Sequence, residues 1–519
     1  MSQWRHAFSL SKQQVAEAEP PGTVQLIEHE HNDHITLIPP PTLSQADPLN
    51  WSRWRKYTVL AIMSIYCFAV NFASACVAPA LQLIMFQLPR PLTSPPPAFG
   101  TLTHLVAFNV LMIGLGNIIW VPVSNIIGRR PVLILTMAIT VASSAWCAVA
   151  GSFNSLLAAR IVQGFGMGPA DSSAANVVGE IFFVHERGRA MAIYTIFLSG
   201  GSFVGGVAGG YIAGTLNYRY VFWISLAMLA FVLVAQIVLV PETRLDRAEQ
   251  LLQDQISAGV QIAYGEKQKA GVETIERAPT NSLSLAPQEF TFASSLRIGV
   301  YRGNVLQQFI APWKTLLLPG TWVVCLHYGG LLGGLVTIST VGPQFLAMPP
   351  YLWGNNVGLL NLGGLAGTIR KAQRESHGLA EPESRLPILF PALMLATGGI
   401  LCFGFSAANP STHAWAGLVV GLGMVGAGIT QIPSVGFNYL IDAYGQLAAD
   451  CFVMTTIARS IISFAWTFFA GDWVASAGPA LPFGIFGMLM GVFGLLTVPL
   501  WLFGKRMRIA TADLMPREE

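Results

Sequence analysis

Two long apolar blocks, separated by a polar segment, limit what this chain can fold into. Residues 57–240 carry ten charges in 184 positions, and residues 315–504 carry eleven in 190. A bilayer core about 30 Å thick takes roughly 20 helical residues per crossing. Turn and charge signals cut each block into six pieces of about that length. Because the apolar runs are continuous rather than alternating, they predict membrane-spanning helices and not barrel strands.

The cuts predict an all-α membrane protein with twelve transmembrane helices in two six-helix halves. The predicted spans are 57–82, 101–124, 131–151, 154–180, 189–214 and 219–240 in the first block, and 316–346, 352–369, 386–407, 414–441, 447–471 and 480–504 in the second. We expect five segments: an N-terminal tail over 1–56, a first half over 57–240, a central loop over 241–315, a second half over 316–504 and a C-terminal tail over 505–519.

The composition agrees with a lipid environment and excludes several soluble functions. Hydrophobic residues make up 53% of the chain and charged residues 11%, whereas a soluble chain carries about 25% charged residues. The net charge of +3 is too small to indicate a nucleic-acid partner. No metalloprotease motif, phosphate loop, nucleophile elbow or zinc-type cysteine pair is present. We therefore expect no enzyme, no cofactor and no metal site, and an ion gradient rather than ATP as the energy source.

Lysine and arginine collect at one end of the predicted spans, which sets the orientation of the chain in the membrane. Both tails and the central loop are accordingly assigned to the cytoplasm. The opposite side receives Arg90 and Arg219. The predicted cytoplasmic side receives Arg53, Arg55, Lys56, Arg129, Arg130, Arg187, Arg189, Arg244, Arg247, Lys314, Arg370, Lys371, Arg374, Arg385, Lys505, Arg506 and Arg508.

The loop after the second predicted span holds a short basic motif. Gly128, Arg129 and Arg130 resemble the signature of the major facilitator superfamily, in which an acidic residue stands where Asn125 stands here. The resemblance implies that this loop locks the two halves together at the cytoplasmic face in the outward-open state. Because Asn125 carries no charge, we expect a weaker lock. The alternative is that the two arginines are only positive-side anchors.

Five further segments, in the same order along the chain, resemble fungal drug/proton antiporters of the twelve-helix type. Together they extend over residues 47–386. They are Asp-Pro-Leu-Asn-Trp-Ser at 47–52, Ala-Arg-Ile-Val-Gln-Gly-Phe-Gly at 159–166, Phe-Phe-Val-His-Glu-Arg-Gly at 182–188, Val-Pro-Glu-Thr at 240–243 and Glu-Pro-Glu-Ser-Arg-Leu at 381–386.

The fifth predicted span is rich in glycine. Small residues at this spacing let two helices approach closely, which is the main packing device in lipid. The pattern resembles the antiporter motif of the same family, although Ser202 and Gly206 stand where that motif has prolines. The alternative is a close-packed helix with no role in the direction of transport. The residues that match the motif are Gly201, Gly205, Gly209 and Gly210.

Arg160 lies within the fourth predicted span, where a bare charge costs at least about 2.5 kcal/mol. Gln163, Met167 and Asp171 follow at spacings of three, seven and eleven, which places them on the same helical face. We interpret this face as lining a cavity, where Arg160 and Gln163 bind substrate or gate residues and Asp171 carries a proton or pairs with a cytoplasmic cation. The alternative is that Arg160 extends toward the surface and Asp171 is a structural partner.

Arg459 is the deepest charge of the second block. An arginine stays charged at any working pH, so it cannot carry the proton, but it can attract an anionic group. The alternative is a salt-bridged packing residue. His327 is a second candidate for proton coupling, beside Asp171. The other cavity candidates are residues of spans that line the cavity in the resembling family: Asn71, His327, Tyr328, Asn438 and Trp466.

These features predict a secondary active transporter whose halves rock about a site near the membrane midplane. Frequent aromatic residues and methionine, with few fixed charges, favour an amphipathic organic substrate. The resemblance implies export of drugs or fungal secondary metabolites across the plasma membrane in exchange for protons. The expected partners are the lipid bilayer, a small molecule and the proton, with the monomer as the working unit. An importer of cations, polyamines or other small nutrients is the alternative, and a non-transporting membrane receptor is a further one.

Overall fold

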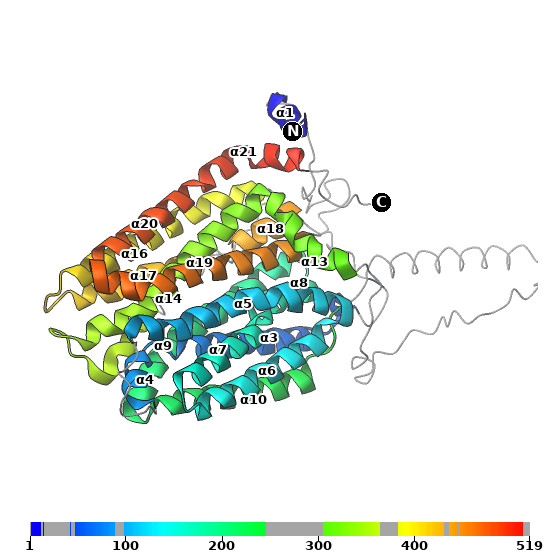
Figure 1. The fold of residues 1–519 in the computed structure, drawn as a ribbon. Helices are drawn as coiled ribbons and strands as arrows, with labels where there is room; N and C mark the ends of the chain where they lie inside the picture. Colours follow the sequence, from blue (N-terminus) through cyan, green and yellow to red (C-terminus); the bar gives the residue numbers. More distant parts are fainter. Residues whose placement is uncertain are drawn as a thin grey trace, which may run out of the picture.

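The computed structural model describes residues 2–11, 14, 42, 47–88, 98–244, 305–363, 382–429, 435–444 and 447–511. Most of the predicted central loop, and Arg247, Arg370, Lys371 and Arg374, lie outside this part of the chain. Within the described residues the regular elements are helices (Figure 1).

The first half forms a bundle of long helices that lies in the lower part of Figure 1. The chain enters it after the short helix α1 (Ser2–Ser9) and a 3-10 turn at Pro48–Asn50. Its helices are α3 (Arg53–Ala75), α4 (Leu81–Gln87), α5 (Phe99–Ile127), α6 (Arg129–Val149), α7 (Phe153–Met167), α8 (Pro169–Ile181), α9 (Val184–Thr215) and α10 (Tyr218–Leu239).

The second half forms the upper bundle of Figure 1, and α1 lies beside its last helix near the C-terminus. Arg508, in the last helix, makes a bidentate ion pair with Glu383. The Nε–Oε1 and Nη2–Oε2 distances are both 2.8 Å. The elements are α13 (Val305–Lys314), η2 (Thr315–Leu317), α14 (Pro319–Ala347), η3 (Gly354–Leu360), η4 (Pro382–Ile388), α16 (Leu389–Ala408), α17 (Trp415–Ile429), α18 (Phe437–Tyr444), α19 (Ala448–Ala477), α20 (Ala480–Leu495) and α21 (Thr497–Ala510).

Nine helices in the described part of the chain are long and apolar enough to cross a membrane, and α17 is a shorter apolar helix. The fourth predicted span differs from the observed helices because it is broken into α7 and α8. Pro169 lacks an N–H group and its ring clashes with the preceding turn, so the helix ends at Met167 and a new one begins. The eighth and tenth predicted spans run partly into 364–381 and 430–434, which lie outside the described residues.

Each bundle has its own apolar core. One buried cluster is built from α14 to α21 and receives a single buried residue, Phe203, from the other bundle. Two more clusters belong to α3 to α10. The bundles are therefore packed internally and meet along a narrower set of contacts.

The glycines of α9 lie on two faces of that helix. Gly201, Gly205 and Gly209 face the backbone of α3. Gly206 and Gly210 face Asn361 and Gly358 of the other bundle. The first face packs α9 inside its own bundle, and the second brings the two bundles together. Because α9 holds no proline, it runs as one continuous helix from Val184 to Thr215.

The close contact between α9 and α3 predicts that a residue larger than glycine does not fit at Gly205. A Cβ at Gly205 would lie 2.7 Å from the carbonyl oxygen of Phe72, a backbone atom that cannot move aside cheaply. We expect Gly205→Ala to destabilise the protein by about 1–3 kcal/mol. The matched control is Gly200→Ala, where the new methyl would meet no atom within 4 Å. Thermal unfolding in detergent measures both, and an unchanged midpoint for Gly205→Ala would contradict this account.

Candidate functional site

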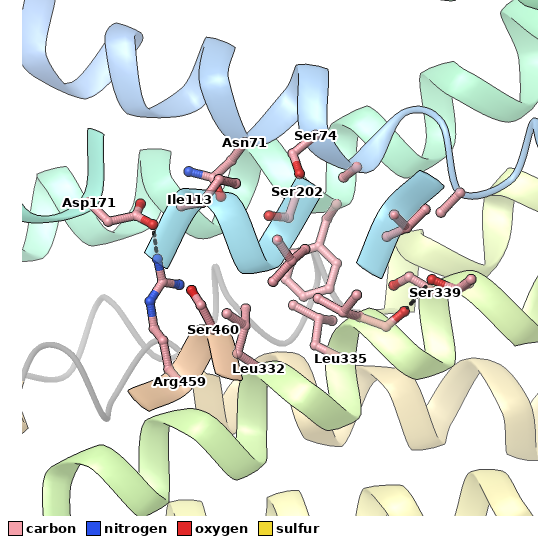
Figure 2. Close-up of a pocket in the computed structure, with 17 residues that line it drawn as sticks. Asn71, Ser74, Ile113, Asp171, Ser202, Leu332, Leu335, Ser339, Arg459 and Ser460 are labelled. Atoms are coloured by element: carbon pink, nitrogen blue, oxygen red, sulfur yellow. Dashed lines mark hydrogen bonds and ion pairs between the residues drawn. The ribbon is translucent and has the colours of Figure 1, made fainter. Parts of the chain in front are cut away.

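The two bundles enclose a small cavity of about 60 Å³ (Figure 2). Helices α3, α5, α8 and α9 line it on one side, and α14 and α19 on the other. The wall is mixed, with aliphatic side chains between hydroxyl and amide groups. Its polar residues are Asn71, Ser74, Asp171, Ser202, Ser339, Thr340, Arg459 and Ser460, and its apolar residues are Ala75, Ala78, Val106, Val110, Ile113, Phe203, Leu332, Leu335 and Val336.

An ion pair between the bundles lies at one end of this cavity. Nη2 of Arg459 on α19 donates to Oδ2 of Asp171 on α8, as Figure 2 shows. Both side chains are buried, with exposed fractions of 4% for Arg459 and 7% for Asp171. The guanidinium also lies 4.9 Å from the ring centroid of Tyr328. The cation therefore has a carboxylate from one bundle and an aromatic face from its own.

The break between α7 and α8 positions this carboxylate. Asp171 lies in the first turn of α8, where the helix N-terminus favours a negative charge. The Tyr194 hydroxyl donates to the carbonyl oxygens of Ala170 and Asp171, at 3.2 and 3.1 Å. Within the described residues, Oδ1 of Asp171 and Nε of Arg459 have no hydrogen-bond partner. Each charged group thus keeps one bonding position that an incoming group could fill.

Arg160 occupies a different place from the one predicted for it. It is fully buried inside the first bundle and is not among the residues that line the cavity. Its guanidinium donates to the carbonyl oxygens of Ala73 and Ser74, at 3.2 and 3.1 Å, and to that of Leu105 at 3.2 Å. Because α3 ends at Ala75, the first two carbonyls belong to its last turn, where the helix supplies no backbone N–H donor; the Ala73 carbonyl also accepts from the Cys76 thiol at 3.4 Å. Arg160 therefore caps the end of α3.

Gln163 belongs to the same buried network. Its Oε1 accepts from Nη1 of Arg160 at 2.6 Å, and its Nε2 donates to the Ser144 hydroxyl at 2.7 Å. Asn109 completes the network, donating to the Arg160 carbonyl at 2.9 Å and accepting from the Ser74 hydroxyl at 2.8 Å. Ser74 also lines the cavity, so the network reaches the cavity through this serine. A ligand-binding role for Arg160 and Gln163 stays a prediction.

The other predicted cavity residues divide between the wall and the second bundle. Asn71 lines the cavity, and its amide donates to the carbonyl of Cys67 at 3.0 Å. Nε2 of His327 instead lies 2.7 Å from the Phe493 carbonyl, inside the second bundle. Trp466 stacks on Phe486 with centroids 4.3 Å apart. Asn438 lies in α18, and Tyr328 reaches the site through Arg459; neither lines the cavity.

Four hydroxyl residues of the wall were not among the predicted cavity residues, although one of them, Ser202, stands where the antiporter motif has a proline. Ser202, Ser339, Thr340 and Ser460 come from three different helices. Serine and threonine are common in transmembrane helices as packing residues, so nothing in their local sequence distinguishes them from the others. They lie in the wall because their positions around their helices turn them toward the other bundle.

A charged cluster stabilises the basic end of the first bundle, the end that holds Arg129 and Arg130. The carboxylate of Glu242 accepts from the backbone N–H groups of Arg129 and Arg130, at 2.8 and 3.0 Å, and so caps α6. Arg129 pairs with Glu180 at 3.1 Å. Gly128 joins α5 to α6 with φ = 117°, a conformation that favours glycine.

Asn125 connects this cluster to the second half of the chain. Its amide nitrogen donates to Oε1 of Gln308 on α13 at 3.2 Å. Its oxygen accepts from Arg244 at 3.3 Å. Asn125, which stands at the acidic position of the family motif, thus makes one hydrogen bond to the neutral Gln308 and one to the charged Arg244. A carboxylate at this position would make an ion pair instead. The weaker lock at the cytoplasmic face stays a prediction, because its strength depends on how the two halves move relative to each other.

The longest contact between the bundles is an antiparallel seam of α5 against α19. From one end to the other it pairs Gly100 with Asp472, His104 with Phe468, Phe108 with Phe464, Gly114 with Ser460 and Val121 with Val453. The cavity lies beside the Ser460 level. Contacts between the bundles are therefore present toward the basic end of the cavity and toward the opposite end.

A helical protein with nine apolar spans in its described part, and with a cavity of mixed lining and an ion pair between two bundles, has the architecture of a membrane transporter. The sequence profile of the Major Facilitator Superfamily matches residues 57–449. The chain belongs to this superfamily and has its twelve-helix fold, as predicted from the sequence.

Individual relatives agree with this assignment. The chain is 31% identical to the MFS transporter cpaT of Aspergillus oryzae, over 89% of this chain and 90% of that protein. It is 25% identical to the efflux pump FUB11 of Gibberella moniliformis, over 80% of this chain and 67% of that one. Among solved structures, the human organic anion transporter MFSD10 has the same fold, with a TM-score of 0.56 and 18% identity over 85% of this chain and 99% of that one.

Proposed function

We propose that this transporter exports amphipathic organic molecules in exchange for protons, by rocking residues 57–240 against residues 316–504. The ion pair between Asp171 and Arg459 is the observation that carries the proposal. It joins the two bundles and contacts the cavity at the same time. Any motion that parts the bundles at this level must separate the two charges.

The cost of that separation is the physical basis of coupling. Removing one partner from a buried ion pair leaves an uncompensated charge and costs about 3–5 kcal/mol. A proton on Asp171 removes one of the two charges. A polar group of the substrate can then replace the carboxylate beside Arg459. With Asp171 ionised, the ammonium of a substrate can instead replace Arg459 beside the carboxylate, and the substrate and the proton then compete for Asp171. The proton and the substrate therefore act on the same ion pair between the bundles, as the exchange of one for the other requires.

The wall of the cavity supports an amphipathic substrate. Its aliphatic residues from α5 and α14 give an apolar surface, and its serine, threonine and asparagine side chains offer a few hydrogen bonds. The relative FUB11 is an efflux pump, which agrees with export. We place the basic end in the cytoplasm, following the distribution of lysine and arginine, with both termini inside, the plasma membrane as the location and the monomer as the working unit.

Proteoliposomes containing the purified protein and a pH-sensitive dye test this proposal. The probes are a fluorescent amphipathic amine and a fluorescent amphipathic carboxylic acid. We expect an imposed proton gradient to drive at least one probe against its own gradient, with a matching proton flux in the opposite direction. Liposomes without protein are the control. Accumulation of probe on the side that protons enter would identify the importer, and binding without movement would identify the receptor.

The Asp171→Asn variant makes the test specific. Asparagine keeps the size and polarity of the side chain but cannot exchange a proton. We expect the variant to lose gradient-driven transport and to keep the exchange of labelled for unlabelled probe at equal pH. If the proton gradient drives transport by Asp171→Asn at the same rate as by the original protein, Asp171 does not carry the coupled proton.

A further inference from the structure

One part of the contact between the bundles is ionisable and lies away from the cavity. At the end of α5 opposite the basic end, Asp472 of α19 lies directly against Gly100. One helical turn further along α5, His104 stacks on Phe468, with centroids 4.4 Å apart and ring planes 5° apart. Because Phe468 and Asp472 are also one turn apart, the imidazole and the carboxylate lie at neighbouring levels of the same seam.

The electrostatic surroundings of His104 are simple. Among the described residues, Asp472 is the charged side chain at the neighbouring level of the seam. The next charge along α5 is Arg160 of α7, which bonds the Leu105 carbonyl. Further along, Asp171 and Arg459 are occupied with each other. Asp472 is exposed and His104 is partly exposed, so protons have access to both.

The backbones of α5 and α19 also approach each other closely at this point of the seam. A Cβ at Gly471 would lie 3.1 Å from the Cα of Gly100. His104 also packs edge-on against Phe108, whose ring contacts Phe464. Parting α5 from α19 at this end pulls the His104 ring from Phe468 and Asp472 from the start of α5.

We propose that His104 and Asp472 form a proton-sensitive latch between the two bundles at the end opposite the basic end. A protonated imidazole is attracted to the Asp472 carboxylate and stacks on Phe468 as a cation on an aromatic face. A neutral imidazole keeps only the ring contact. A pH low enough to protonate His104 therefore holds this end closed, and a higher pH releases it. With the proposed orientation, the latch responds to extracellular pH.

The latch is tested by the access of a reagent to the cavity, which requires no knowledge of the substrate. Ser202→Cys places a thiol in the cavity wall. A membrane-impermeant maleimide is added from outside to right-side-out vesicles at about pH 5.5 and about pH 7.5, and labelling of protein without the added thiol is subtracted. Because thiol reactivity itself rises with pH, each rate is divided by the rate for His104→Phe carrying the same reporter.

His104→Phe preserves the aromatic stack and removes the charge. Exposed charge pairs contribute up to about 1 kcal/mol, so we expect the normalised rate to fall about two- to fivefold between the higher and the lower pH. Asp472→Asn, which keeps the imidazole and its stack on Phe468 but removes the carboxylate, should make that fall smaller. A normalised rate that is constant across the range, or a fall that is as large in Asp472→Asn as in the original protein, overturns the proposal.

Discussion

Replacing Arg459 by glutamine is expected to lower gradient-driven transport by at least about 100-fold. The substitution leaves the Asp171 carboxylate buried and unpaired, a change that costs about 3–5 kcal/mol, and 1.4 kcal/mol corresponds to a factor of ten. The Tyr328 ring loses its cation at the same time. Transport of the amine and carboxylic acid probes in proteoliposomes measures the loss.

A double substitution separates the effect on stability from the effect on transport. Arg459→Gln combined with Asp171→Asn removes both charges and leaves two neutral groups that can hydrogen-bond. We expect the double variant to regain most of the thermal stability lost by Arg459→Gln and to remain inactive under a proton gradient. Arg219→Gln is the matched control, because this half-buried arginine bonds only local partners, Asn217 and Tyr218, in the described contacts. Recovery of gradient-driven transport in the double variant would show that the pair is structural.

Much of the fold could be predicted from the sequence because lipid allows few backbone arrangements. Continuous apolar runs must form helices, and their length fixes the number of crossings. The details that differ arise from single residues. The first predicted span, 57–82, is observed as α3 from Arg53 to Ala75, with a turn around Pro79 and a separate α4 from Leu81. Whether a helix breaks at such a residue depends on whether neighbouring groups can hydrogen-bond to the backbone N–H and C=O groups that the break leaves without a helical partner.

The site was predictable only in part, because it depends on contacts between distant segments. Asp171 and Arg459 were each identified as buried charges, but their pairing joins residues 288 positions apart. His327 shows the opposite case. Its depth in an apolar span suggested a cavity role, yet the phase of α14 turns it toward Phe493 in its own bundle. Depth can be estimated from span boundaries, whereas the direction of a side chain requires the packing of the whole bundle.

The glycine pattern of α9 illustrates a further limit. Its spacing predicted close packing against one neighbour, and α3 is that neighbour on the face of Gly205. The second face, where a Cβ at Gly210 would lie 2.9 Å from the backbone of Gly358, joins the two bundles. The two faces are interleaved along one helix, so a period of four or five residues describes both. The sequence pattern alone cannot assign each glycine to its neighbour.

Arg160→Met is expected to destabilise the first bundle by about 3–5 kcal/mol. Methionine approximates the length of the side chain but donates no hydrogen bond. The change therefore removes the donors of the Ala73 and Ser74 carbonyls at the end of α3 and the partner of Gln163. A positive charge at a helix C-terminus is lost with them. Thermal unfolding in detergent measures the effect.

Arg160→Lys distinguishes a structural cap from a substrate ligand. A lysine keeps the charge but cannot reproduce the planar fork that serves α3, α5 and Gln163 together. If Arg160 acts as a cap, the lysine variant should lose less stability than Arg160→Met, and each variant should lose transport only to the extent that it unfolds. If Arg160→Met unfolds at the same temperature as the original protein and still does not transport, the cap is dispensable and the arginine binds the substrate. The four bonds of its guanidinium to buried oxygens favour the first outcome, because a cation already occupied in this way has little capacity left for a ligand.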